Sequence, residues 1–214
     1  MINKFLALII LLIMSPLFFL LSILLLIVQG RPIFYSQIRI GKNYNLFSLL
    51  KFRSMIINKE GPQITEEKDK RITFFGKILR RSKIDELPQL INIIKGDLNF
   101  VGPRPEVEEY VKKYNFSFLN KIKPGLTDYS SIIFFDEEKL LSKLGGIDNY
   151  HKVLEVKLEL INYYINTRNN WIDLKIIMFT IIGIFIPSTV RFYLKNSIYK
   201  INPLLWTRIT EVGL

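Results

Sequence analysis

The longest apolar stretch of the chain lies close to its amino terminus. Residues 5–28 read FLALIILLIMSPLFFLLSILLLIV and contain no charged residue. A helix needs about 20 apolar residues to cross a bilayer, so this stretch is long enough to enter one. It exceeds the apolar region of about 7–15 residues in a cleavable signal peptide, and the following VQGRP offers no cleavage site of small residues. The pattern therefore predicts a membrane helix within residues 1–30.

A Ser15-Pro16 pair interrupts this stretch near its middle. Proline has no amide hydrogen and its ring collides with the carbonyl four residues back, here that of Leu12, so we expect a bend. The Ser15 hydroxyl is placed to satisfy a freed carbonyl. The residues alone leave two topologies open: a kinked helix that spans the membrane, and a re-entrant helix that returns to the same face. Lys4 and Arg31 flank the stretch, and basic residues favour the cytoplasmic side, which only the re-entrant form satisfies at both ends.

Beyond residue 30 the pattern changes. Apolar and polar residues alternate on both sides of a GKNYN turn within residues 32–55, which predicts a β-hairpin. A polar stretch containing Gly-Pro, residues 58–70, predicts a surface loop. Helical spacing marks residues 72–81 and 150–168. The fold class expected is α+β: a small, mostly helical domain with one short β-hairpin behind the membrane helix.

A further helix start is expected near two adjacent carboxylates. Ser82 precedes DELPQLINIIKG, and the Ser-x-x-Asp spacing resembles a capping box. Pro88 is tolerated only in the first turn, so the helix should begin close to Asp85, and Gly96 is a typical stop. This arrangement places Asp85 and Glu86 at a helix start.

The carboxyl-terminal part is again apolar. Residues 173–187 (DLKIIMFTIIGIFIP) are too short to span a bilayer and suit a buried or interfacial amphipathic helix. Residues 191–214 mix Arg and Lys with aromatic and aliphatic residues, a composition that can lie on an anionic membrane surface. The expected domains are thus 1–30 (membrane helix), 31–190 (the main domain, on the cytoplasmic side) and 191–214 (a basic aromatic tail).

Composition narrows the possible chemistry. The 214 residues carry a formal net charge of +11, one histidine and no cysteine. Disulfides and thiolate zinc sites are therefore excluded. His151 lies on a polar segment, where we expect an exposed or capping histidine. With a single histidine in the chain, catalysis by histidine is not expected. Nucleic-acid binding finds no recognisable module, and anionic lipids and phosphate substrates already account for the charge.

The acidic pair suggests phosphate chemistry. A carboxylate at a helix start is stabilised by free amides, and the basic segment 80–83 acts in the same direction, so Asp85 should stay ionised. Such a carboxylate can attack phosphorus and form an acyl phosphate. Mg²⁺ suits a site of carboxylate and phosphate oxygens, and Arg80 and Arg104 can each hold a phosphate at two points. Alone, an Asp-Glu pair is more often a simple helix cap, and a basic cluster is usually solvated surface.

Taken together, the motifs resemble the bacterial sugar transferases in their minimal form, the monotopic phosphoglycosyl transferases. The matching pieces cover nearly the whole chain and occur in the family's order: Ser15-Pro16, FYSQIRIGK (34–42), LLKFRSM (49–55), FGKILRRSKIDELPQLINIIKGDLNFVGPRPE (75–106), YVKKY (110–114), KPGLT (123–127) and DLKIIMFT (173–180). The 75–106 block is the most specific of them.

The resemblance implies a function and a location. The substrates would be a UDP-sugar and a polyprenol phosphate such as undecaprenyl phosphate, and the product a polyprenyl diphosphate sugar. Asp85 would be the nucleophile and contact Mg²⁺, releasing UMP and carrying a covalent phosphosugar, with Glu86 as its partner in the dyad. Lys51, Arg80 and Arg104 would lie near the phosphates. The helix would be re-entrant at Ser15-Pro16, in the bacterial inner membrane, with the active site on the cytoplasmic face.

One segment departs from the family pattern. After the Pro-Gly-x-Thr turn many members continue with Gly-Trp-Ala-Gln-Val-Asn-Gly-Arg-Asn, whereas residues 128–141 here read DYSSIIFFDEEKLL. Contacts that the family draws from that loop do not carry over, and donor choice is expected to differ there. The sequence specifies neither the sugar, nor the glycan pathway, nor the oligomeric state. Two alternatives stay open: a glycosyltransferase that releases UDP, and a non-catalytic membrane scaffold of a glycan-assembly complex.

Overall fold

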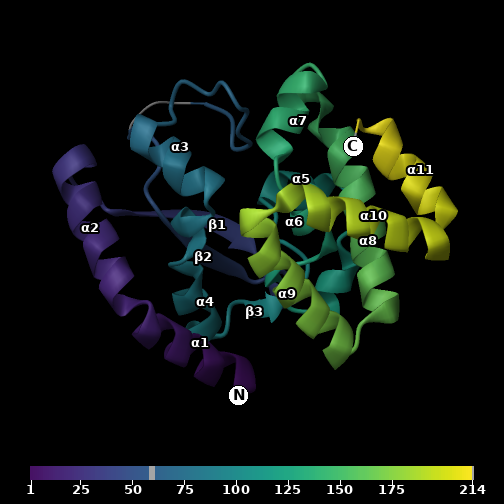
Figure 1. The fold of residues 1–214 in the computed structure, drawn as a ribbon, viewed down its shortest axis with the longest axis horizontal. Helices are drawn as coiled ribbons and strands as arrows, with labels where there is room; N and C mark the ends of the chain where they lie inside the picture. Colours follow the sequence, from purple (N-terminus) through teal and green to yellow (C-terminus); the bar gives the residue numbers. More distant parts are fainter. Residues whose placement is uncertain (58–60, 214) are drawn as a thin grey trace. The chain divides into compact units, whose positions relative to one another are not determined.

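The computed structural model describes residues 1–57 and 61–213, and it is α+β and mostly helical, as predicted (Figure 1). The chain divides into two compact units, residues 1–59 with 71–126 and residues 60–70 with 127–214. The elements run in the order α1 (Ile2–Ile13), α2 (Ser15–Gln29), β1 (Phe34–Ile40), η1 (Lys42–Tyr44), β2 (Leu46–Phe52), α3 (Phe74–Arg81), η2 (Ile84–Glu86), α4 (Gln89–Lys95), β3 (Asn99–Val101), α5 (Glu108–Lys113), η3 (Ser117–Asn120), β4 (Gly125–Thr127), α6 (Tyr129–Ile133), α7 (Glu137–Lys143), η4 (Ile147–Asn149), α8 (Tyr150–Thr167), α9 (Asn170–Phe185), α10 (Pro187–Ile201) and α11 (Pro203–Glu211).

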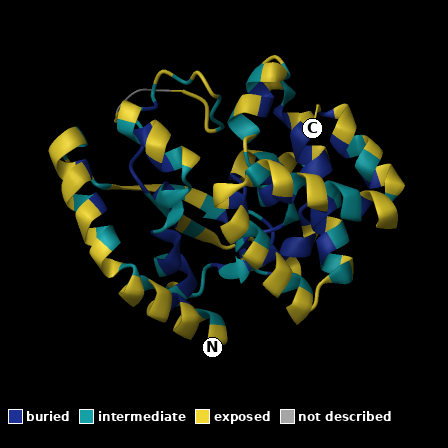
Figure 2. Cartoon of the chain, viewed as in Figure 1, coloured by how far each residue is buried: buried dark blue, intermediate teal, exposed yellow. Residues whose placement is uncertain are grey.

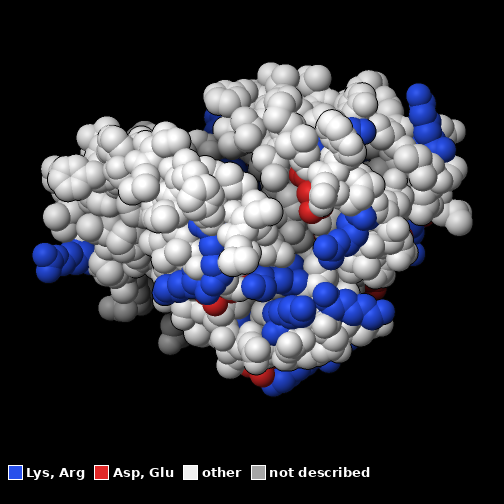
Figure 3. All heavy atoms as spheres, turned by 90° about the horizontal axis from the view of Figure 1, so that it is seen from below, with Lys and Arg blue, Asp and Glu red and all other residues white. Residues whose placement is uncertain are grey.

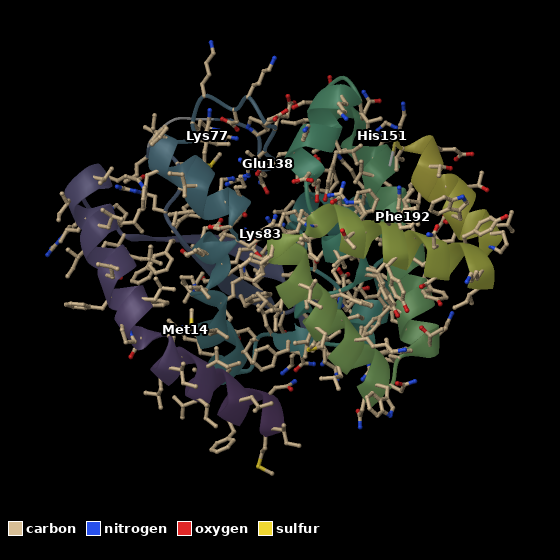
Figure 4. All side chains as sticks on the ribbon, viewed as in Figure 1. Met14, Lys77, Lys83, Glu138, His151 and Phe192 are labelled. Atoms are coloured by element: carbon tan, nitrogen blue, oxygen red, sulfur yellow. The ribbon has the colours of Figure 1, made fainter. Side chains whose placement is uncertain are left out.

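The amino-terminal stretch bends where Ser15-Pro16 predicted it. Helices α1 and α2 meet at Met14, labelled in Figure 4, at an angle of 63°. The Ser15 hydroxyl donates a hydrogen bond of 2.8 Å to the Leu12 carbonyl, the group that the proline ring denies its usual donor. Within residues 1–57 and 61–213, no single helix is long and apolar enough to cross a membrane, whereas α1 and α2 reach that length and apolarity together.

The bent pair is buried along one side only. Two apolar clusters hold it to the first unit: Ala7 with Leu49, Leu90, Ile93 and Leu98, and Leu21 and Leu25 with Phe52 and Leu79. Figure 2 shows most of the remaining surface of α1 and α2 as exposed, with some half-buried positions. That surface carries large apolar side chains, among them Phe5, Phe19 and Ile27, which are 65–75% exposed. Contiguous exposed apolar surface of this kind marks a site of association rather than a water-facing surface.

The predicted hairpin is confirmed and a second small sheet joins it. Strands β1 and β2 pair antiparallel, with Phe34 opposite Phe52 and Ile40 opposite Leu46. Strands β3 and β4 form a separate two-stranded sheet, which the sequence pattern did not predict. Their ends meet at Gly102 and Gly125, and a Cβ at Gly125 would lie 2.2 Å from the Gly102 amide nitrogen. Only glycine allows this approach, which joins the residue after β3 to the start of β4, two segments far apart in sequence.

The helix expected to begin at Asp85 begins at Gln89 instead. Ser82 ends α3, and its hydroxyl donates to the Ile78 carbonyl at 2.8 Å, so it caps no following helix. Lys83 has a left-handed backbone (φ 57°), which breaks the helical path and sets Asp85 and Glu86 in the single turn of η2. The stop at Gly96 (φ 97°) is confirmed. The predicted helix at 72–81 is also confirmed, as α3.

The second unit contains the segment that departs from the family pattern. Residues 128–141 form no open loop there, because α6 and α7 cover most of them. Asp128 caps α6 by accepting a 2.7 Å hydrogen bond from the Ser131 amide, while Ile133 and Leu141 are fully buried. The predicted helix at 150–168 is confirmed as α8, at whose start His151 is exposed, with its Nδ1 2.9 Å from the Asp148 carbonyl.

The polar loop and the carboxyl-terminal part of the chain complete the second unit. In the predicted loop 58–70, residues 61–70 form neither helix nor strand, and residues 58–60 lie outside the described residues. The apolar stretch 173–187 folds mainly as α9, and the tail as α10 and α11. Helix α9 exposes large apolar side chains, including Trp171, Met178 and Phe185.

Asn92 joins α4 to the hairpin. Its side chain is fully buried; Nδ2 donates to the Ser48 carbonyl at 2.8 Å and to Asp97, and Oδ1 accepts from the Leu50 amide at 3.0 Å. Removing this fully buried side chain would remove three hydrogen bonds, each with a net contribution of about 0.5–1.5 kcal/mol.

Asn92→Ala should therefore lower the melting temperature of the protein in mild detergent by several degrees, equivalent to about 2–4 kcal/mol. Asn120→Ala, at an exposed position, is the matched control and should leave it unchanged. Equal melting temperatures for the two variants would contradict the role assigned to Asn92.

Candidate active site

Lys51, Glu86 and Arg104 form one ionic cluster in the first unit. Lys51 Nζ, at the end of β2, lies 2.9 Å from Glu86 Oε1. Arg104, from the turn after β3, donates to both oxygens of the same carboxylate, at 2.6 Å to Oε1 and 3.3 Å to Oε2. The Glu86 side chain is only 13% exposed. Three of the predicted site residues are thus brought together by hydrogen bonds.

The cluster fixes the charge of Glu86. Burial alone would raise the pKa of Glu86, but the nearby cations Arg104 and Lys51 outweigh it and hold this pKa well below its usual range. Burial lowers the pKa of Lys51, against the attraction of Glu86. Glu86 is therefore an anion whose hydrogen-bonding capacity is largely used by two cations.

Asp85, the residue before Glu86, has an oxygen without a hydrogen-bond partner among the described residues. It is 3% exposed, and its Oδ1 finds no hydrogen-bond partner among residues 1–57 and 61–213. Burial raises the pKa of Asp85 above its ordinary value, and Lys51 is the main opposing influence. This direction is contrary to the sequence-based expectation, because η2 lies ahead of α4 and the carboxylate is withdrawn from water.

Arg80 completes the predicted set. It lies in the last turn of α3, and its guanidinium donates to the Ser54 hydroxyl at 3.4 Å. Its charge, like that of Lys51, favours the ionised form of Asp85. Ser15 and Pro16 lie apart from this group of elements in the chain, at the α1–α2 junction, where the Ser15 hydroxyl serves the helix itself.

Sequence reasoning missed Arg53, although it belongs to the quoted LLKFRSM motif. Arg53 is 5% exposed and donates to the carbonyl of Gln29, the last residue of α2, and to those of Gly30 and Arg31, which follow it. A charged donor at a helix carboxyl terminus satisfies carbonyls that have no partner within the helix. The only signal was an arginine one residue after an apolar strand, which does not by itself specify a cap.

The carboxylates can be tested for their fit to a divalent metal. The described part of the chain contains no group of three or more His, Cys, Asp or Glu side chains that could hold an ion. Glu86 is occupied by its cations, so the protein offers the unpartnered Oδ1 of Asp85. Mg²⁺ is often held by one or two carboxylates together with phosphate oxygens and water, and the site fits that arrangement.

Comparison with known proteins identifies the family. A sequence profile described as "Bacterial sugar transferase" matches residues 1–187. An Aeromonas hydrophila protein named UDP-N-acetylgalactosamine-undecaprenyl-phosphate N-acetylgalactosaminephosphotransferase is 31% identical over 174 residues, which cover 78% of this chain and 38% of that protein. The UDP-glucose:undecaprenyl-phosphate glucose-1-phosphate transferase of Escherichia coli K12 is 30% identical over 188 residues, covering 85% of this chain and 39% of that protein. The uncharacterized sugar transferase EpsL of Bacillus subtilis is 31% identical over 164 residues, covering 76% of this chain and 74% of EpsL.

The motifs and the sequence matches agree on one class, the sugar transferases. The chain belongs to the bacterial sugar transferase family. It spans less than two fifths of the length of the A. hydrophila and E. coli relatives.

The two carboxylates should respond differently to neutralisation. Glu86→Gln leaves two partly buried cations uncompensated and should destabilise the protein by about 3 kcal/mol at pH 7.5. Because the Glu86 pKa is lowered in the folded state, its contribution is complete above the ordinary glutamate pKa and is lost as the pH falls through the lowered value. Asp85→Asn removes a charge that burial disfavours, so it should keep or raise the melting temperature.

The measurement is thermal unfolding in detergent with a metal chelator present, from pH 7.5 downward. Asp148→Asn, at an exposed carboxylate, is the control. A melting temperature for Asp85→Asn that falls as far as that of Glu86→Gln would refute the division of roles.

Proposed function

We propose that this protein is a phosphoglycosyl transferase that moves a sugar-1-phosphate from a UDP-sugar to a polyprenol phosphate and releases UMP. The observation that supports this most directly is the buried Asp85 with an unpartnered oxygen beside Glu86, which Lys51 and Arg104 bind. The names of the A. hydrophila and E. coli relatives, which specify sugar phosphate transfer to undecaprenyl phosphate, support the same reaction.

The first step is attack by Asp85. Its carboxylate oxygen forms a bond to the phosphorus that bears the sugar, the bond from that phosphorus to the UMP oxygen breaks, and UMP leaves with the electron pair. Lys51, Arg80 and Arg104 place positive charge around the reacting diphosphate, which favours the charge that develops on it. Figure 3 shows a face on which Lys and Arg side chains gather, and the net charge of the chain is +11. A surface of this charge attracts anionic substrates.

In the second step an oxygen of the polyprenol phosphate attacks the same phosphorus. The bond to Asp85 breaks, the carboxylate is regenerated and the polyprenyl diphosphate sugar departs. A phosphate monoester has a second pKa of about 6, so most of this acceptor has already lost its second proton at neutral pH. Glu86, with its lowered pKa, is a weak base, which favours a role in positioning Lys51 and Arg104 over one in deprotonating the acceptor.

Mg²⁺ is proposed as the cofactor. The Asp85 carboxylate would hold it together with oxygens of the donor, and when bound it would neutralise charge on the diphosphate. The contribution of the chain itself is the placement of one free carboxylate and three cations around that group.

The membrane helix is proposed to be re-entrant, in the bacterial inner membrane with the active site facing the cytoplasm. Near the start of α1, Lys4 Nζ donates to the Lys95 carbonyl at 3.2 Å and Asn3 to Asn99 at 3.1 Å. At the end of α2, Arg53 donates to the Gly30 carbonyl at 3.0 Å. Both ends of the bent pair are thus bound to the same unit, which favours a return to one face over a span. The exposed apolar side chains of α9 and the basic aromatic tail would contact lipid at the interface.

Asp85→Asn should abolish nucleotide release, lowering the rate by roughly a thousandfold or more, because the attacking oxygen is lost. The assay uses purified protein in detergent with Mg²⁺, undecaprenyl phosphate and a panel of UDP-sugars, and quantifies UMP and UDP separately. Asp148→Asn should retain wild-type release. Release of UDP would indicate the alternative glycosyltransferase, and no release from folded protein would favour the non-catalytic scaffold.

Topology can be tested with single cysteines, since the natural chain has none. Ile2→Cys and Lys42→Cys should both react with a membrane-impermeant thiol reagent from the cytoplasmic side only, and Met14→Cys should be protected by lipid. Modification of Ile2→Cys from the opposite side would show that the helix spans. Pro16→Leu restores a donor to the helix and should shift Ile2→Cys toward that outcome.

A further inference from the structure

Two buried polar side chains on α4 differ in one respect. Asn92 is fully buried, and both ends of its amide are hydrogen-bonded to the protein. Gln89, the first residue of the same helix, is 1% exposed, yet its Nε2 has no partner in the part of the chain that the structure describes. Buried amide donors without a partner are rare in folded proteins, and each calls for an explanation.

The unpartnered donor lies one turn from an unpartnered acceptor. Gln89 follows Asp85 by four residues, and the residues between them, Leu87 and Pro88, have right-handed helical backbone angles. Side chains with this separation are neighbours on a helical path. Both η2 and α4 contact β2, the strand that contributes Lys51. The site therefore contains a free carboxylate oxygen and a free amide donor, both withdrawn from water.

The chemistry of these two groups limits what can satisfy both. A metal cation would satisfy the Asp85 oxygen but has nothing to accept from an N–H group. A water molecule can serve both groups but does not explain why the chain buries them. A phosphoryl group offers a phosphorus atom to the carboxylate oxygen and, around it, oxygens that accept from the amide.

We propose that Gln89 is a further catalytic residue, whose side-chain amide donates a hydrogen bond to an oxygen of the phosphoryl group that Asp85 attacks. This inference rests on the proposed function. The amide is neutral, so it adds no charge to compete with Lys51 or to hold a product too tightly. As the phosphoryl group moves from UMP to Asp85, the donor orients it and stabilises the charge on its oxygens. The ligand class is the sugar-bearing phosphate of a nucleotide sugar.

Gln89→Met tests this, because methionine has similar length and volume but no donor. UMP release is measured in single turnovers without acceptor, on the full-length chain in detergent with Mg²⁺ and the UDP-sugar that the wild type uses. The rate constant should fall by about a hundredfold, the effect expected for loss of one such donor, while the KM for the donor changes little. The melting temperature should stay the same or rise, because an unpartnered buried amide has been removed. Gln89→Glu, which replaces the donor with an acceptor, should be slower still.

Two controls keep the outcomes distinct. Gln63→Met, at an exposed loop position, should match the wild type in both measurements. Asn92→Ala shows how a structural amide behaves, with loss of stability. The inference would be overturned if the rate constant of Gln89→Met stayed within about threefold of the wild type, or if this variant lost as much stability as Asn92→Ala. In either case, UMP release by the wild type would still support the proposed function. Absence of UMP release from folded wild-type protein would overturn both.

Discussion

The carboxylate of Glu86 holds together three segments that are distant in sequence. It receives Lys51 from the end of β2 and both ends of the Arg104 guanidinium from the turn after β3, while its own backbone forms η2. Removing three charges from water is costly, and the cost is offset only where the geometry is good and the groups are fully paired. Here the Arg104 contact is bidentate, so the cluster meets that condition and fixes the relative positions of the β1–β2 hairpin, η2 and the turn after β3.

The neighbouring carboxylate, Asp85, has an oxygen without a hydrogen-bond partner in the described part of the chain. Glu86 and Asp85 are adjacent, Asp85 buried and Glu86 half-buried, yet the oxygens of Glu86 are occupied and Asp85 has a free Oδ1. A fold optimised only for stability would leave no buried acceptor unpaired. Natural proteins break such rules mainly where function requires it, and well-paired residues around the site then offset the lost stability. The structure thus separates a carboxylate that binds two cations from one that keeps an unpartnered oxygen.

The sequence predicted what depends on local chemistry. The bend at Ser15-Pro16, the hairpin with its GKNYN turn, and the helix at 72–81 follow from a missing amide hydrogen, alternation and helical spacing, and each is confirmed. The start of α4 and the β3–β4 sheet were missed, because the left-handed backbone of Lys83 and the contact between Gly102 and Gly125 are settled by tertiary packing. The sequence motifs identified Asp85 and Glu86 as site residues. Their opposite pKa shifts depend on burial and on charged partners, which the spacing of residues in the sequence does not predict.

One strand connects the apolar helix pair to the candidate chemistry. Lys51, which contacts Glu86, and Arg53, which receives the end of α2, are two residues apart at the end of β2. In extended chain that separation is about 7 Å, and neither residue can move far without the other. If α1 and α2 lie in a bilayer, the depth of α2 therefore fixes the height of the acidic pair above the lipid. Under the proposed function, a soluble nucleotide sugar and a lipid-linked phosphate would then reach the same carboxylate in turn, without a large movement of the protein.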